Sequence, residues 1–250
     1  MLAIPLVVGS VAAGRPTMAS VSIVPAVVLL FLARFAALPA ATRLASGRNV
    51  PEGYFARRFL WSGIYLAASG ALLLVAVTTT SPASRGATVA TAMMTGVLGT
   101  IHAALALVAL DRTVWGELIG LTGLACSAPL VISTAGRPMD GRAWSAGILC
   151  LGYFVSSLAY VRAYRRRTGR SGERDVLLAC VGVHVLVVAS AAALWARGWL
   201  PAGGAWVHAP VVIRTAWGLA RPPASLRAVG WTEMAVASAF LVLASLAFVV

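Results

Sequence analysis

The chain has few charged residues, no lysine and only three cysteines. Charged residues make up 11% of its 250 positions and hydrophobic residues 60%. A soluble domain carries about a quarter charged residues, so this shortage excludes an ordinary soluble domain, and the high hydrophobicity excludes a disordered chain. Cys126, Cys150 and Cys180 lie in apolar runs without a CxxC pair. We therefore expect buried, unreactive thiols rather than a metal or redox motif.

Acidic residues are scarcer still, with seven acids against twenty arginines and a formal net charge of +13. In a soluble protein such a charge would point to nucleic acid. Here the arginines stand between apolar runs, so we expect no nucleic-acid partner. Their distribution instead reports how the chain is oriented in a lipid bilayer.

Long apolar runs dominate the sequence. A spanning helix needs about 20 mostly apolar residues. Nine segments fit this pattern, and we predict an all-α, polytopic membrane helix bundle forming a single domain over residues 1–250. Seven segments reach or nearly reach the spanning length, the eighth is short, and the first looks truncated. They are Leu2–Ala13, Met18–Leu38, Phe59–Thr78, Thr88–Leu110, Val114–Thr134, Trp144–Arg162, Val176–Ala196, Ala205–Ala220 and Gly230–Val250.

Arginines are distributed unevenly between the two sets of loops. The loops after the even-numbered segments hold twelve arginines and the loops of the opposite side hold five. Cytoplasmic loops carry the excess of positive charge. The even loops are therefore predicted to face the cytoplasm, which places the N-terminus inside.

Six ionisable residues fall within or at the edge of predicted spans, where such groups are costly and usually functional. His102 and His184 are each eight residues from a predicted cytoplasmic end, about 12 Å deep at the helical rise. We expect all six to line a polar cavity that opens toward the cytoplasm. No metal-binding or catalytic motif accompanies them. The six are His102, Glu117, Arg162, His184, Arg214 and Glu233.

Structural interpretations of these residues stay open. Each histidine can simply bond a neighbouring carbonyl or hydroxyl group. Glu117 can be an interfacial carboxylate beside glycines whose spacing permits close helix approach. Arg214 and Glu233 can form a buried pair that joins segments eight and nine, or an anion site, because arginine suits bidentate phosphate binding. His208 is predicted at the outer interface, with no role.

The second half of the chain resembles the YwiC-like family of bacterial integral membrane proteins. This resemblance implies a multi-pass protein of the bacterial inner membrane and brings no defined activity. The family opens with a Glu-His-Gly-Ala-Trp-type motif, and Met1–Leu6 is similar to the family's residues just after that motif, so we expect a missing upstream turn. The matching stretches are Trp115–Leu124, Ala128-Pro129, Tyr153–Arg162, His184, Ala209–Trp217, Arg221-Pro222 and Gly230–Glu233.

The nine-segment layout is also similar to intramembrane prenyltransferases related to UbiA. Those enzymes hold a prenyl diphosphate through Mg²⁺ on aspartate-rich loops, a cofactor that oxygen ligands suit. Here the corresponding loops offer only Glu52, Glu173 and Asp175. Enzymatic activity is thus undecided. The alternatives are a UbiA-like enzyme acting on a prenyl or lipid diphosphate, and a small transporter or membrane partner subunit, although no inverted repeat is visible in the sequence.

Overall fold

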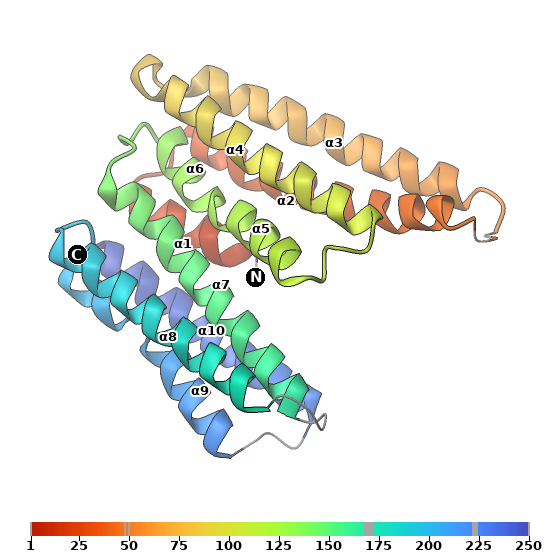
Figure 1. Ribbon diagram of the computed structural model, residues 1–250. Helices are drawn as coiled ribbons and strands as arrows, with labels where there is room; N and C mark the ends of the chain where they lie inside the picture. The colour runs from red at the N-terminus through yellow and green to blue at the C-terminus, as the bar shows by residue number, and fades with distance from the viewer. Residues whose placement is uncertain (1, 48, 50, 168–172, 222–224, 250) are drawn as a thin grey trace. The chain divides into compact units, whose positions relative to one another are not determined.

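A computed structural model describes residues 2–47, 49, 51–167, 173–221 and 225–249 (Figure 1). All the regular structure in these residues is helical. In the described residues seven spans are long and apolar enough to cross a membrane, one of them made of α5 and α6 together, and they coincide with the seven full-length segments predicted. The elements are α1 Ala3–Ala13, α2 Met18–Ala45, α3 Tyr54–Thr79, α4 Pro82–Leu107, α5 Val114–Ala125, α6 Ser127–Thr134, α7 Gly141–Arg167, α8 Glu173–Ala196, η1 Ala202–Trp206, α9 Ala209–Ala220 and α10 Leu226–Val249.

The chain divides into two compact units. The N-terminal unit is Ala13–Met139, which contains α2 to α6. The C-terminal unit is Asp140–Val250 together with Ala3–Ala12, and contains α7 to α10. The prediction of one domain therefore stays a prediction, and each unit is described by itself.

Small residues at a seven-residue step hold α2 against α3, which run side by side in Figure 1. Two serines of α3 donate across the interface, Ser62 to the Ala33 carbonyl at 3.2 Å and Ser69 to the Ala26 carbonyl at 2.8 Å. Small side chains let backbones approach closely, and such hydroxyls bridge helices where no water is available. The buried positions of the step are Ala19, Ala26, Ala33 and Ala40 on α2, and Ser62, Ser69 and Ala76 on α3.

The fifth predicted segment is broken into α5 and α6 at Cys126. Proline at 129 has no N–H to bond the carbonyl four residues earlier, which explains a break at this point. Gly116 of α5 lies against the backbone of Leu110 and Asp111, where a Cβ would overlap. This contact is with the turn that precedes α5, so the close approach of two helices predicted from the glycine spacing stays a prediction at Gly116. A hydroxyl contact between Thr91 of α4 and Ser133 of α6, at 3.3 Å, ties α4 to the second half of the same segment.

In the C-terminal unit, α7 packs against α8, α9 and α10. The short helix α9 buries Val211, Arg214, Thr215 and Gly218, the i, i+3, i+4, i+7 stripe of an amphipathic helix. Its 12 residues cover about 18 Å, less than the hydrocarbon core of a bilayer. The predicted short eighth segment is therefore confirmed, as a 3₁₀ turn (η1) followed by a half-length helix.

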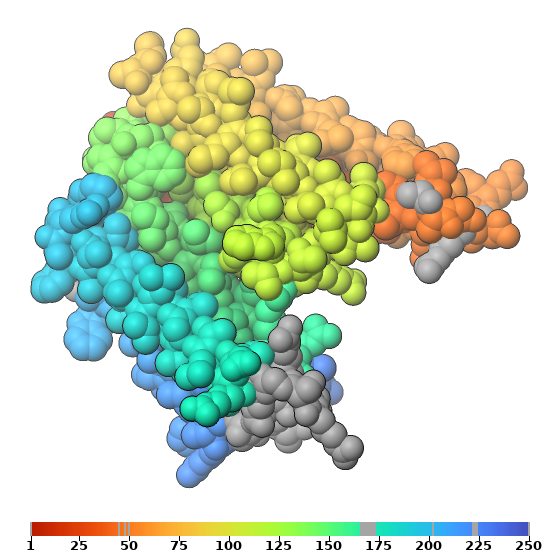
Figure 2. All heavy atoms as spheres, in the orientation of Figure 1, coloured from red at the N-terminus to blue at the C-terminus, as the bar shows by residue number. Residues whose placement is uncertain are grey.

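Large apolar side chains remain exposed along the spanning helices. Leu60 and Leu74 of α3, and Leu178 and Leu186 of α8, are each more than three-fifths exposed. In Figure 2 the side chains of α8 lie on the visible face of their unit. A soluble protein rarely exposes such continuous apolar surface. Seven apolar helices with outward apolar faces make this a multi-pass membrane protein. The three cysteines are buried free thiols, as predicted.

Candidate functional site

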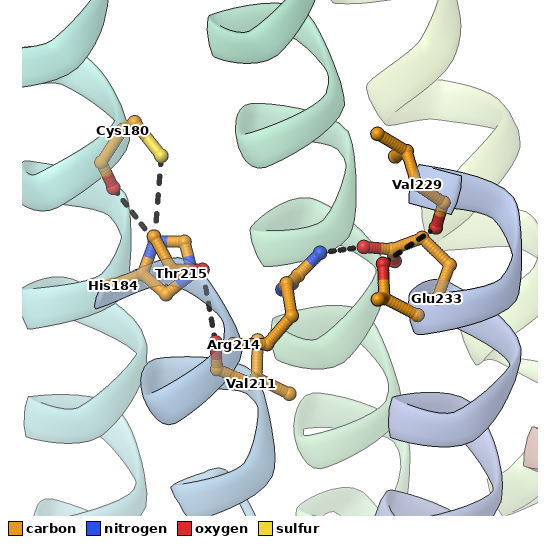
Figure 3. A network of polar contacts seen from close by, with 8 residues as sticks. Cys180, His184, Val211, Arg214, Thr215, Val229 and Glu233 are labelled. Carbon is orange, nitrogen blue, oxygen red and sulfur yellow. Dashed lines mark hydrogen bonds and ion pairs between the residues drawn. The ribbon is translucent and has the colours of Figure 1, made fainter. Parts of the chain in front are cut away.

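Helix α9 holds the buried polar residues of the C-terminal unit in contact with three other helices. Arg214 reaches toward α10 and Thr215 toward α8 (Figure 3). Gly218, one turn later, lies against the Tyr160 hydroxyl of α7, where a Cβ would overlap. Arg214, Thr215 and Gly218 lie on the buried face of α9, and each contacts a different neighbouring helix.

Arg214 carries the buried positive charge of this unit. It is only 7% exposed and forms an ion pair with Glu233 of α10. Its guanidinium carbon lies 4.1 Å from the centroid of the Tyr160 ring, a cation–π contact. A guanidinium has five N–H donors. Among the described residues, the buried nitrogens of Arg214 have no hydrogen-bond acceptor beyond this ion pair. The predicted pair between segments eight and nine is confirmed. The pair does not use all the N–H donors of Arg214.

His184 of α8 forms the other half of the network. Its Nδ1 lies 2.8 Å from the Cys180 carbonyl and its Nε2 lies 2.8 Å from the Thr215 hydroxyl. Because a carbonyl only accepts, Nδ1 carries the proton that is donated there. The Thr215 hydroxyl in turn lies 2.9 Å from the Val211 carbonyl. The expectation that this histidine bonds a neighbouring carbonyl and hydroxyl is confirmed.

Hydroxyl groups of α7 extend the polar interior. Tyr153, Ser156 and Ser157 are each no more than 1% exposed. The Tyr153 ring stacks on Phe240 of α10 at 4.6 Å between centroids, and Tyr153 and Tyr160 both interact electrostatically with Arg214. Tyr153 and Tyr160 are two turns apart and so share one face of α7. Sequence reasoning missed both tyrosines, because an aromatic residue inside an apolar run carries no distinguishing signal.

The N-terminal unit contains a second set of ionisable groups. His102 of α4 lies 2.9 Å from the Gly116 carbonyl, and its ring packs on Gly120, where a Cβ would come within 2.9 Å. Glu117 is half-buried in the first turn of α5. Electrostatic interactions join His102 to Arg34, Asp111 and Glu117. Arg34, half-buried on α2, was missed in the sequence, although it is a charge inside a predicted span.

The six predicted site residues therefore fall into two groups. Arg214, Glu233 and His184 belong to the network of the C-terminal unit. His102 and Glu117 belong to the N-terminal unit. Arg162 is half-buried on α7, two residues beyond Tyr160 and so on another face of the helix. One cavity lined by all six stays a prediction.

The predicted equal depth of the two histidines stays a prediction. Helix α4 ends five residues after His102, and α8 begins eleven residues before His184. At 1.5 Å per residue these are about 8 Å and 17 Å from the respective helix ends. The helix ends differ from the predicted segment ends Leu110 and Val176, because hydropathy alone does not locate the turn after Leu107 or the charged first turn of α8.

His208 is buried, and its predicted place at the outer interface stays a prediction. It precedes α9, is 2% exposed, and lies 5.5 Å from Phe240 between ring centroids. Gly152 of α7 leaves room for its ring, since a Cβ there would come within 2.9 Å of Nε2. Burial lowers the pKa of His208 to about 4, so the ring is neutral at neutral pH.

Among the residues that the structure describes, no group of three or more His, Cys, Asp or Glu side chains can hold a metal ion. Glu52 and Asp175 are exposed, and the side chain of Glu173 is outside the described part of the chain. Comparisons with protein-family models, curated proteins and solved structures give no match to this chain.

Proposed function

We propose that the C-terminal unit is a membrane-embedded binding site for the anionic end of an apolar ligand, a lipid or prenyl diphosphate. The observation that carries the proposal is the unused hydrogen-bonding capacity of Arg214. A buried polar group without a partner costs free energy, and more so when it is charged. An anionic, oxygen-rich group is the ligand that would satisfy these donors.

The broken eighth element supports the same proposal. A half-length helix at membrane depth is tolerated where it is enclosed by protein or lines a cavity. Discontinuous helices form many substrate sites in membrane proteins. Arg214 lies at the sixth of the twelve residues of α9, and Tyr160 and Glu233 fix its guanidinium from two sides. A fixed guanidinium loses little further entropy when it binds a planar or tetrahedral oxyanion.

The proposal also includes a family and a membrane for the protein. We place the protein with the YwiC-like proteins in a bacterial inner membrane, on the motifs in residues 115–233. Turnover of a prenyl or lipid diphosphate, as in UbiA-like enzymes, would here depend on arginine rather than Mg²⁺ to hold the diphosphate. Ligand binding is the step that can be tested before any reaction is known.

Transport is the second candidate function. In each unit the first long helix contacts three others: α2 packs on α3, α4 and α6 of the four other helices of its unit, as α7 packs on α8, α9 and α10. A Trp-x-Glu sequence lies in the first turn of α5, Trp115 to Glu117, and another lies in the second turn of α10, Trp231 to Glu233. Transporters are commonly built from repeated halves. Flux of a labelled ligand across a vesicle membrane, without chemical change, would favour this candidate.

The test is thermal unfolding of the purified protein in detergent, titrated with farnesyl diphosphate and with geranylgeranyl diphosphate. Each titration is run with and without Mg²⁺. A ligand at a hundred times its dissociation constant stabilises the protein by about 2.7 kcal/mol. We expect a rise in melting temperature that needs no Mg²⁺.

The informative variant is the double substitution Arg214→Gln with Glu233→Gln, which removes both charges and leaves no unpaired ion. It should fold and lose the ligand-dependent shift. Arg221→Gln is the matched control, because Arg221 caps the same helix but is exposed and lies over Trp217. A shift that survives in the double variant, or no shift with any ligand in a folded wild-type protein, contradicts the proposal.

A further inference from the structure

We infer a second, separate binding site in the N-terminal unit, which takes the headgroup of an anionic glycerophospholipid between Arg43, Tyr54 and Arg58. Both guanidinium groups lie over the same ring. The Arg43 and Arg58 guanidinium carbons are 4.9 Å and 5.5 Å from the centroid of Tyr54. One aromatic ring thus contacts two positive charges, an arrangement that a bound phosphate group would stabilise.

These residues lie at the ends of two candidate spans, where the phosphates of lipid headgroups are expected. The spanning part of α2 ends at Leu44, one residue after Arg43, and the spanning part of α3 begins at Tyr54 itself. The two helices are adjacent and their connected ends lie together in Figure 1. Aromatic residues with a polar tip and arginines mark the boundary between hydrocarbon and headgroups. The site is therefore placed for a lipid headgroup rather than for an acyl chain.

A hollow beside Arg43 provides room for the headgroup. Its volume is about 330 Å³, and Pro39, Thr42, Arg43 and Ser46 line it. This size is at the small end of ligand pockets and suits a phosphate with a few attached atoms. Proline at 39 cannot donate to the carbonyl four residues earlier. The hydroxyls of Thr42 and Ser46 donate to backbone carbonyls, and their oxygens can still accept hydrogen bonds from the hydroxyl groups of a glycerol headgroup.

An apolar track continues from the hollow along α2. Phe35 is one turn before Pro39 on the same face of the helix and is 57% exposed. Phe31, one turn earlier, packs edge-on against Phe35 at 4.8 Å between centroids. A lipid whose phosphate sits between the arginines would lay an acyl chain along these rings. This continuity selects a lipid over a soluble phosphate compound.

The test compares adjacent arginines. Arg57 and Arg58 carry the same charge on the same turn of α3 and both are exposed, but only Arg58 lies over Tyr54. The protein is titrated in detergent with phosphatidylglycerol and with phosphatidylcholine, and binding is measured from the shift in melting temperature. We expect phosphatidylglycerol to bind more tightly than phosphatidylcholine, and Arg58→Gln and Arg43→Gln to weaken it about tenfold, the equivalent of one charge-assisted hydrogen bond. Arg57→Gln should change it less than about twofold.

A second ligand and a comparison of the two arginine variants can each contradict the inference. Glycerol 3-phosphate has the same anionic group without acyl chains, and binding as tight as that of phosphatidylglycerol would overturn the lipid assignment. Equal losses in Arg57→Gln and Arg58→Gln would show diffuse charge attraction and overturn the site. Should Arg58→Gln fail to fold, Arg58→Lys keeps the charge but loses the flat contact with Tyr54, and it should still weaken binding. Unchanged binding in that variant also counts against the inference.

Discussion

Each unit holds an arginine within a spanning or half-spanning helix, but the surroundings of the two arginines differ. Arg214 of the C-terminal unit is 7% exposed, paired with Glu233 and held on the face of Tyr160. Arg34 of the N-terminal unit is half-buried, and its electrostatic partner Asp111 lies in the turn between α4 and α5. A buried pair is sensitive to the loss of either partner, whereas a half-exposed pair is screened by water. Burial, rather than residue type, distinguishes the site from its counterpart.

The largest difference in stability between the two units is expected when the carboxylate partner of each arginine is removed. Glu233→Ala leaves Arg214 buried without its counter-charge, and we expect a loss of about 3–5 kcal/mol in the free energy of unfolding. Asp111→Ala should cost no more than about 1 kcal/mol. Unfolding by a denaturing detergent in mixed micelles measures both. The double variant Arg214→Gln with Glu233→Gln should recover most of the loss, and equal losses in the two units would remove the distinction.

Acid should destabilise the C-terminal unit through His208. This residue lies outside the seven spanning helices, and burial lowers its pKa to about 4 from an ordinary value of about 6.5. As the pH falls from about 6.5 to 4, the unfolded state takes up a proton that the folded state refuses. Stability is therefore lost in that window, by up to about 3 kcal/mol. His208→Gln should flatten the dependence of the melting temperature on pH, and hydrogen exchange resolved by peptide should show α7, α9 and α10 opening first.

Adding a methyl group to one glycine in each unit tests how rigidly its neighbour is held. Gly218→Ala would collide with the Tyr160 hydroxyl, and Tyr160 is fixed by Arg214, so we expect a loss of about 1–3 kcal/mol. Gly120→Ala meets the half-exposed ring of His102, which can move, and should cost less. Gly182→Ala on α8, with nothing within 4 Å, is the control. Melting temperatures in detergent decide the order, and a larger loss for Gly120→Ala would reverse the comparison.

The smallest effects should come from single hydroxyl groups. Thr215→Val removes the hydroxyl partner of His184, and we expect a loss of about 1 kcal/mol, which Thr215→Ser restores. Ser69→Ala removes one bond between α2 and α3 and should cost about 0.6 kcal/mol, an ordinary value in a membrane. Chemical unfolding of the variants side by side resolves this difference. A Thr215→Val effect no larger than that of Ser69→Ala would mean that the His184 contact adds nothing specific.

Part of the candidate site was readable in the sequence and part was not. Charges inside apolar runs identified Arg214, Glu233 and His184, because an ionisable residue in such a run is rare. The same rule should have found Arg34. Tyr160, Tyr153 and Thr215 carry no such signal, since neutral residues of these types are common in spanning helices. Their roles follow only from which face of α7 or α9 they occupy.

The order of amino acids is enough to establish the class of the protein and the number and approximate limits of its seven spanning segments, because about 20 consecutive apolar residues are costly to expose to water. It also contains the seven-residue step of small residues in α2 and α3, which could have been read as a packing surface. The folded arrangement was needed to establish that Arg214 meets Glu233 and Tyr160, and that His102 meets Gly116. Hydropathy is a sum along the chain, whereas a contact depends on the rotation and pairing of helices, which many distant side chains fix together.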